Sequence, residues 1–136
     1  MTGRTRVFVD SNIPMYASDK EHPNKIPSIK VLELISEGKI IGMTSTEVFQ
    51  EILYRYQAIE LLDKGLEVFD SFSSIIDKTL SVNLNIMREA RNILKENNIN
   101  VRDVVHIATM DYYGISYIAS YDKNFKEFKH IRYFEA

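Results

Sequence analysis

Short apolar runs typical of β-strands alternate with helical stretches along the whole chain, and this alternation strongly constrains the fold. Runs rich in β-branched and aromatic residues predict strands at 7–9, 39–43, 79–82, 115–120 and 131–134. Apolar residues at helical spacing predict helices at 28–37, 44–62, 66–76, 83–95 and 100–113. Strands that alternate with helices are typical of parallel sheets covered on both faces. We therefore expect an α/β fold with three layers, α/β/α, and a parallel sheet of four or five strands.

Local signals predict where several helices begin and end. Ser28 is expected to cap the first long helix. Thr44 and Glu47 fit a capping box, S/T-x-x-E, that would open a helix running to about residue 62. The Asp-Lys-Gly segment at 63–65 is expected to break that helix. Other boundaries follow from residue type alone, with a cap at Asn100 and stops at Gly38 and Gly114.

The composition is that of an ordinary soluble globular protein. The 136 residues are 45% hydrophobic and 26% charged, so we expect a single domain over residues 1–136. No apolar run is long enough to cross a membrane, and no apolar export segment precedes the first strand. We therefore expect a cytoplasmic protein without membrane contact. The net charge of −2 disfavours a protein that coats nucleic acid through bulk attraction.

The residue types present also limit the kind of metal site. The chain has no cysteine and only three scattered histidines, so a zinc site is not expected. A bound metal is therefore expected to have oxygen ligands. Such carboxylate sites suit hard cations, of which Mg²⁺ and Mn²⁺ are the candidates.

Acidic residues stand at positions that a parallel sheet would bring to one edge. Asp10 ends the first strand, and Asp122 follows the fourth by two residues. In open parallel sheets, ligands bind beyond the carboxyl ends of the strands. Glu51 lies in the second turn of the helix after the second strand, and Asp103 in the first turn of the helix at 100–113. Because that helix follows another helix, the position of Asp103 depends on the tertiary fold.

Glu51 is the more informative of two candidate glutamates on its helix. It is flanked by Val48, Ile52 and Ile59 on one helical face, where an unpaired carboxylate is costly. A divalent cation shared with other carboxylates would compensate it. Glu47 lies one turn earlier, but the capping box already gives it a structural task. Taken singly, each aspartate could equally be a helix cap or turn residue.

Four segments of the chain resemble motifs of the PIN domain family, in particular the small ribonucleases typified by the VapC toxins of toxin–antitoxin pairs. The segments are 7–12, 44–53, 102–109 and 118–125, and they follow the family's order over nearly the whole chain. Within them, Ser11 stands where many relatives have Thr, and Tyr121 where the family usually has a small residue. Tyr121 is expected to narrow the pocket and so to affect substrate preference.

The resemblance implies a PIN-like fold and an acidic pocket that binds Mg²⁺ or Mn²⁺. The acids of the family fall on Asp10, Glu51, Asp103 and Asp122, as metal-binding and catalytic residues. Asn12 and Ser120 match its small polar residues, which are expected to orient the carboxylates or contact substrate. The implied activity is metal-dependent hydrolysis of RNA phosphodiester bonds. The implied partners are an RNA substrate, an antitoxin protein and a second copy in a homodimer.

Two other functions remain open from the residues alone. One is a receiver-like or phosphatase-like domain that carries phosphate on an aspartate, although Ser11 and Asn12 follow Asp10 where such domains need a second acid. The other is a PIN-fold module that binds RNA or protein without cleavage. His106, one turn after Asp103, stands where a ligand or general-base role is conceivable, but it is expected to be a packed helix residue. Basic residues that could contact RNA phosphates are Lys20, Lys25, Lys123, Lys126, Lys129 and Arg132.

Overall fold

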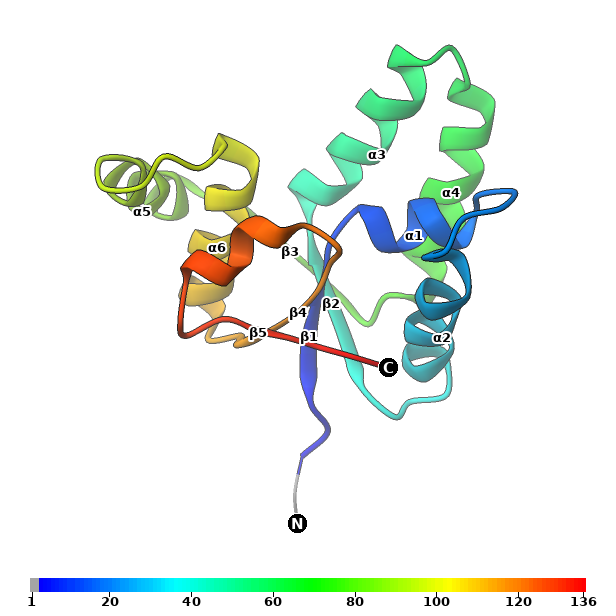
Figure 1. The fold of residues 1–136 in the computed structure, drawn as a ribbon, viewed down its shortest axis with the longest axis horizontal. Coiled ribbons are helices and arrows are strands. Elements are labelled where there is room, and N and C mark those ends of the chain that lie inside the picture. Colours follow the sequence, from blue (N-terminus) through cyan, green and yellow to red (C-terminus); the bar gives the residue numbers. More distant parts are fainter. Residues whose placement is uncertain (1–2) are drawn as a thin grey trace.

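The computed structural model describes residues 3–136, which form a five-stranded parallel sheet between two layers of helices (Figure 1). The strand order is β3-β2-β1-β4-β5, and all four pairings are parallel. The strands are β1 (Arg6–Val9), β2 (Ile41–Ser45), β3 (Lys78–Leu80), β4 (Tyr117–Ala119) and β5 (Arg132–Tyr133). The predicted α/β class and parallel sheet are therefore confirmed, although β4 and β5 are shorter than expected.

The helices divide between the two faces of the sheet. They are α1 (Asn12–Ala17), α2 (Lys25–Ser36), α3 (Thr46–Ala58), α4 (Leu62–Ile75), α5 (Leu84–Leu94) and α6 (Val101–Tyr113), followed by the 3-10 helix η1 (Lys123–Glu127). In Figure 1, α5 and α6 lie on one side of the sheet and α1, α2 and α4 on the other. No helix within residues 3–136 is long and apolar enough to span a membrane.

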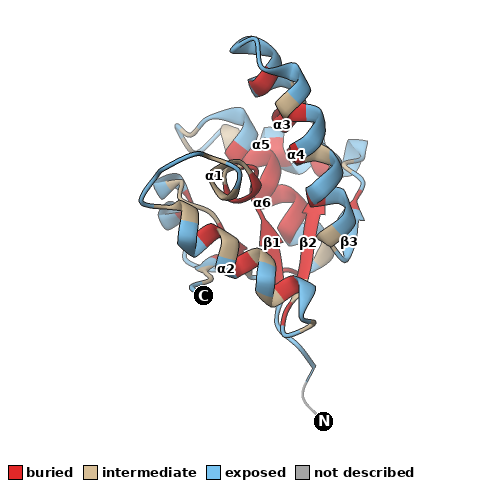
Figure 2. Ribbon diagram, turned by 90° about the vertical axis from the view of Figure 1, so that its right-hand side faces the viewer, coloured by how far each residue is buried: buried red, intermediate tan, exposed pale blue. Residues whose placement is uncertain are grey.

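The core is built around the central strand β1. Val7, Phe8 and Val9 have no exposed surface, as expected for a strand covered on both faces. Figure 2 shows β1 and β2 as a buried layer behind helices whose outer faces are exposed. Helix α6 is buried over eight consecutive residues, from Asp103 to Met110. A charged residue in the first turn of α6 is therefore held inside the molecule.

The order of the strands creates a crevice beside β1. The chain runs outward from β1 through β2 to β3 and then crosses back to β4 on the other side of β1. At this switch point the loops after β1 and β4 leave the sheet in opposite directions, which opens a crevice where ligands bind in such folds. Val9 is paired with Ala119, so the residues that follow each strand emerge side by side.

Two of the predicted helix caps are wrong. Asn24, not Ser28, is the N-cap of α2, and Ser28 lies buried within the helix. The capping box at Thr44 and Glu47 does not form, because β2 continues to Ser45 through its pairing with β3. The Thr44 hydroxyl instead donates a hydrogen bond to the Val9 carbonyl at 2.8 Å. The caps at Asn100 and Gly114 are confirmed, the latter with a φ of 70°.

The predicted break at 63–65 is also wrong. Helix α3 already ends at Ala58, and Glu60 has a left-handed φ of 60° in the turn that follows. Gly65 lies inside α4, where an added Cβ would stand 2.6 Å from the Cβ of Tyr56. The glycine therefore permits close packing of α4 on α3 and does not interrupt a helix.

Candidate active site

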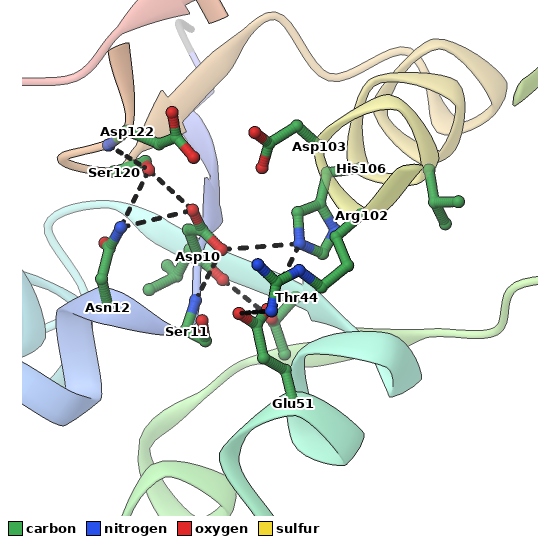
Figure 3. A network of polar contacts seen from close by, with 12 residues as sticks. Asp10, Ser11, Asn12, Thr44, Glu51, Arg102, Asp103, His106, Ser120 and Asp122 are labelled. Atoms are coloured by element: carbon green, nitrogen blue, oxygen red, sulfur yellow. Dashed lines mark hydrogen bonds and ion pairs between the residues drawn. The ribbon is translucent and has the colours of Figure 1, made fainter. Parts of the chain in front are cut away.

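The four predicted acids line one cavity of about 230 Å³ beyond the carboxyl ends of β1 and β4. Asp10 follows β1, Glu51 lies on α3, Asp103 is in the first turn of α6, and Asp122 precedes η1. Figure 3 shows their side chains gathered around the same space. The remaining residues of the wall are Ser11, Asn12, Tyr16, Arg55, Arg102 and Tyr121. The structure thus brings together acids that lie far apart in the chain.

Asp10 is held rigidly by its neighbours. Its Oδ1 accepts a hydrogen bond from the Ser11 backbone N–H at 2.8 Å, and its Oδ2 accepts one from the Ser120 hydroxyl at 2.6 Å. Asn12 Nδ2 in turn donates to the Ser120 hydroxyl at 3.2 Å, as does the Asp122 backbone N–H at 3.0 Å. Asn12 and Ser120 therefore both contact the carboxylate of Asp10.

Asp103 is surrounded by amides and by other acids. Asn100 Nδ2 and Asn124 Nδ2 both donate to its Oδ2, at 2.8 and 2.9 Å. Burial raises the pKa of Asp103 to about 6, with the neighbouring carboxylates of Asp122 and Asp10 acting in the same direction. The contact from Asn124 was not predicted, because residues 21 apart in the chain meet here only through the tertiary fold. In the metal-free protein, Asp103 therefore takes up a proton more readily than an ordinary aspartate.

His106 is a packed residue of α6, as predicted, but it also faces the acids. Only 2% of it is exposed, and its ring packs on Phe8 with centroids 5.3 Å apart. Nε2 lies 3.5 Å from Asp10 Oδ1 and 3.9 Å from Glu51 Oε1. Burial lowers the pKa of His106, but the charges of Glu51 and Asp10 outweigh burial and raise it.

The possible metal-ligand atoms of His106 and its neighbours lie close enough together to bind one cation. Within the described residues, neither ring nitrogen of His106 has a hydrogen-bond partner, which is unusual for a buried polar group. Asp10, Glu51 and His106 each offer one ligand atom, and these atoms lie within 4.8 Å of one another. The two carboxylates suit Mg²⁺ or Mn²⁺, whereas the imidazole would add a nitrogen ligand to the oxygen ligands expected from the sequence. The spacing Asp103–His106, one helical turn, was the sequence signal for this side chain.

Glu51, not Glu47, lines the cavity, and it is compensated by arginines. Its Oε2 lies 3.1 Å from Arg55 Nε and 3.2 Å from Arg102 Nη1. Burial raises the pKa of Glu51, but His106 and the two arginines outweigh burial and lower it. The sequence predicted that this buried carboxylate needs compensation but did not predict either arginine.

Several residues that the sequence analysis singled out lie outside this cavity in the structure. Glu47 is exposed on the outer face of α3, and Ile59 is 60% exposed because α3 ends before it. None of the six basic residues proposed to contact RNA is part of the cavity wall. Lys123 and Lys126 instead border a neighbouring cavity of about 790 Å³.

The chain is similar in sequence and in fold to known proteins. The sequence profile of the family described as PIN domain matches residues 7–131. Ribonuclease VapC13 from Mycobacterium tuberculosis is 33% identical over 127 residues, which cover 93% of this chain and 97% of the relative. The structure of Mycobacterium tuberculosis VapC20, a toxin that cleaves the sarcin–ricin loop, superposes with a TM-score of 0.74 at 16% identity, covering 89% of this chain and 93% of that chain. A toxin–antitoxin complex from Klebsiella pneumoniae gives a TM-score of 0.67 at 12% identity, covering 96% of this chain and 99% of that chain.

Proposed function

Because this chain belongs to the PIN domain family, we propose that it is a metal-dependent endoribonuclease, the toxin of a type II toxin–antitoxin pair. The observation that carries the proposal is the convergence of Asp10, Glu51, Asp103 and Asp122 on one cavity at the switch point of the sheet. Like charges this close favour a cation among them. The similarity to ribonuclease VapC13 supports RNA as the substrate.

In this proposal, Asp10, Glu51 and Asp103 hold Mg²⁺ or Mn²⁺, and Asp122 completes the site or positions water. His106 lies against the Asp10 and Glu51 carboxylates and is not one of the proposed ligands. When bound, a divalent cation lowers the pKa of water and neutralises charge that grows on the phosphate. Ser11 and Ser120 hold the Asp10 carboxylate in one orientation through their hydrogen bonds. Asn12 and Ser120 are proposed to orient the carboxylates or to contact substrate, and not to bind the metal.

An antitoxin protein and a second copy of this chain are the proposed partners. The similarity in fold to the toxin–antitoxin complex from Klebsiella pneumoniae supports the antitoxin. Residues 1–136 are proposed to form a single domain, of which residues 1 and 2 lie outside the described part. Co-expression with a protein encoded next to this one, followed by mass measurement of the purified species, tests both partners.

A cleavage assay tests the proposed activity. Wild type is expected to cut a fluorogenic single-stranded RNA in Mn²⁺ or Mg²⁺ and not in EDTA. Asp10→Asn should lower the rate more than about 100-fold, which exceeds the usual cost of removing an outer hydrogen-bond partner. Glu47→Gln is the matched control, since Glu47 lies one turn before Glu51 on α3 but faces solvent. Undiminished cleavage in EDTA, or by folded Asp10→Asn, would overturn the proposal.

A further inference from the structure

Two arginines at the cavity supply more positive charge than Glu51 requires. Arg55 lies one turn after Glu51 on α3, whereas Arg102 comes from the first turn of α6. Both guanidinium groups contact the same oxygen, Glu51 Oε2, at 3.1 and 3.2 Å. One arginine would neutralise this carboxylate. Because two are present, the group formed by Arg55, Arg102 and Glu51 has a net charge of +1, beside the three aspartates that line the same cavity.

The arginines are open on the side away from Glu51. The Glu51 side chain is 8% exposed, whereas the side chains of Arg55 and Arg102 are 46% and 53% exposed. Arg55 contacts Glu51 through Nε and Arg102 through Nη1, so other N–H donors of each planar guanidinium group stay accessible. Figure 3 shows Arg102 extending from α6 over Glu51 beside the carboxylates. The pair is thus anchored from inside and presents donors to the cavity.

We propose that Arg55 and Arg102 form a binding site for a phosphate of the RNA backbone, beside the carboxylates of the active site. The inference rests on the proposed function, because it names the part of the substrate that the pair contacts. Planar guanidinium groups match phosphate oxygens in geometry, and their hydrogen bonds to phosphate are charge-assisted. The two arginines would also reduce electrostatic repulsion, because an RNA phosphate must approach a cavity lined by four carboxylates. Glu51, proposed above as a metal ligand, then also positions both arginines at the wall, because both contact its Oε2.

RNA binding in the absence of cleavage is the direct test. A labelled single-stranded RNA is titrated with the Asp10→Asn protein in EDTA at several salt concentrations. Adding Arg55→Gln and Arg102→Gln together should weaken binding about 10- to 100-fold, the range for hydrogen bonds to a charged group. The slope of log affinity against log salt should fall by about 0.7 for each phosphate that the variant no longer neutralises. Arg88→Gln is the control, because Arg88 is exposed on α5 and outside the cavity wall.

Two further variants separate phosphate binding from folding. The double Gln variant leaves Glu51 buried without its partners, so it is compared with a triple variant that also carries Glu51→Gln, and thermal unfolding is measured for both. Arg55→Lys with Arg102→Lys retains the charge but removes the planar fork, and it should restore only part of the affinity. Folded Gln variants that bind RNA with the same affinity and salt slope as the Asp10→Asn protein would show that the arginines only neutralise Glu51.

The RNA-binding test can be interpreted whether or not the chain is a nuclease. Cleavage by wild type in Mn²⁺, together with unchanged RNA binding by the Gln variants, overturns the phosphate site and leaves the proposed activity standing. Absence of cleavage, together with weakened binding by the Gln variants, overturns the activity and supports the phosphate site.

Discussion

At the scale of single residues, the surroundings of Glu51 stabilise its ionised form, whereas those of Asp103 destabilise it. Glu51 has two arginine partners, and its pKa is lowered. The Asp103 carboxylate accepts hydrogen bonds only from neutral amides in the described part of the chain, and its pKa is raised to about 6. In the metal-free protein, the ionised form of Asp103 is therefore a source of instability.

The replacement Asp103→Asn should stabilise the metal-free protein near neutral pH. A carboxyl whose pKa is raised on folding, from 3.8 to about 6, contributes stability at low pH that disappears as pH rises through this interval. The free energy of unfolding of the variant should exceed that of wild type by up to about 3 kcal/mol at pH 7.5. Most of this difference should disappear at pH 4. Urea unfolding in EDTA at both pH values measures the difference. Glu47→Gln, a change of an exposed carboxylate, should shift stability by less than about 0.5 kcal/mol. An advantage that does not depend on pH would contradict the assigned cause.

Whether the sequence alone could predict a residue of the site depends on how far along the chain its contact partners lie. Asp10 and Asp122 could be predicted because each follows a strand, and the ends of parallel strands meet at one edge. Asn124 and Arg102 could not be assigned from local sequence. Asn124 approaches Asp103 from 21 positions away, and Arg102 reaches Glu51 from a different helix. No local periodicity encodes such pairs.

At the scale of elements, the start of α6 serves both the helix and the site. Asn100 Oδ1 accepts a hydrogen bond from the Asp103 backbone N–H, and its Nδ2 donates to the Asp103 carboxylate. The N-cap of α5 has only the first of these roles, because Asn83 Oδ1 accepts from the Ile86 N–H at 2.9 Å. The two helices therefore provide a matched pair of caps.

Replacing each cap by alanine separates stability from metal binding. Asn100→Ala and Asn83→Ala should each lower the free energy of unfolding by about 1 kcal/mol, the usual cost of removing an N-cap. Only Asn100→Ala should weaken Mn²⁺ binding, by about 10-fold, because it also removes a hydrogen-bond partner of Asp103, a proposed ligand. Urea unfolding and calorimetric titration with Mn²⁺ measure the two effects. Equal Mn²⁺ affinity of the two variants would mean that the Asn100 amide does not orient Asp103.

At the scale of the whole molecule, the sheet forces several like charges together. The crossover from β3 to β4 brings the loops after β1 and β4 side by side, while α3 and α6 add one carboxylate each. A cation that binds this arrangement binds the folded state alone, because the unfolded chain disperses the four acids. Metal binding and global stability should therefore be coupled.

Adding Mn²⁺ should raise the melting temperature of the protein. At a free concentration about 100 times the dissociation constant, binding adds about 2.7 kcal/mol to the free energy of unfolding. For a domain of this size, that corresponds to roughly 10 °C. Thermal unfolding followed by circular dichroism measures the shift, which should be much smaller for Asp10→Asn and undiminished for Glu47→Gln. An equal shift in all three proteins would place the bound ion elsewhere.

The chain by itself determined the class of the fold, because periodicity, strand-forming runs and the caps at Asn100 and Gly114 depend on neighbours within a few residues. The tertiary structure decided where β2 and α3 end. Pairing of Thr44 and Ser45 with β3 extends the strand through the expected cap, and packing of α4 against Tyr56 accounts for Gly65. The tertiary structure also brought His106 and two arginines close to the Glu51 carboxylate. These outcomes depend on contacts between distant residues, whose energies exceed the small local preferences that a sequence displays.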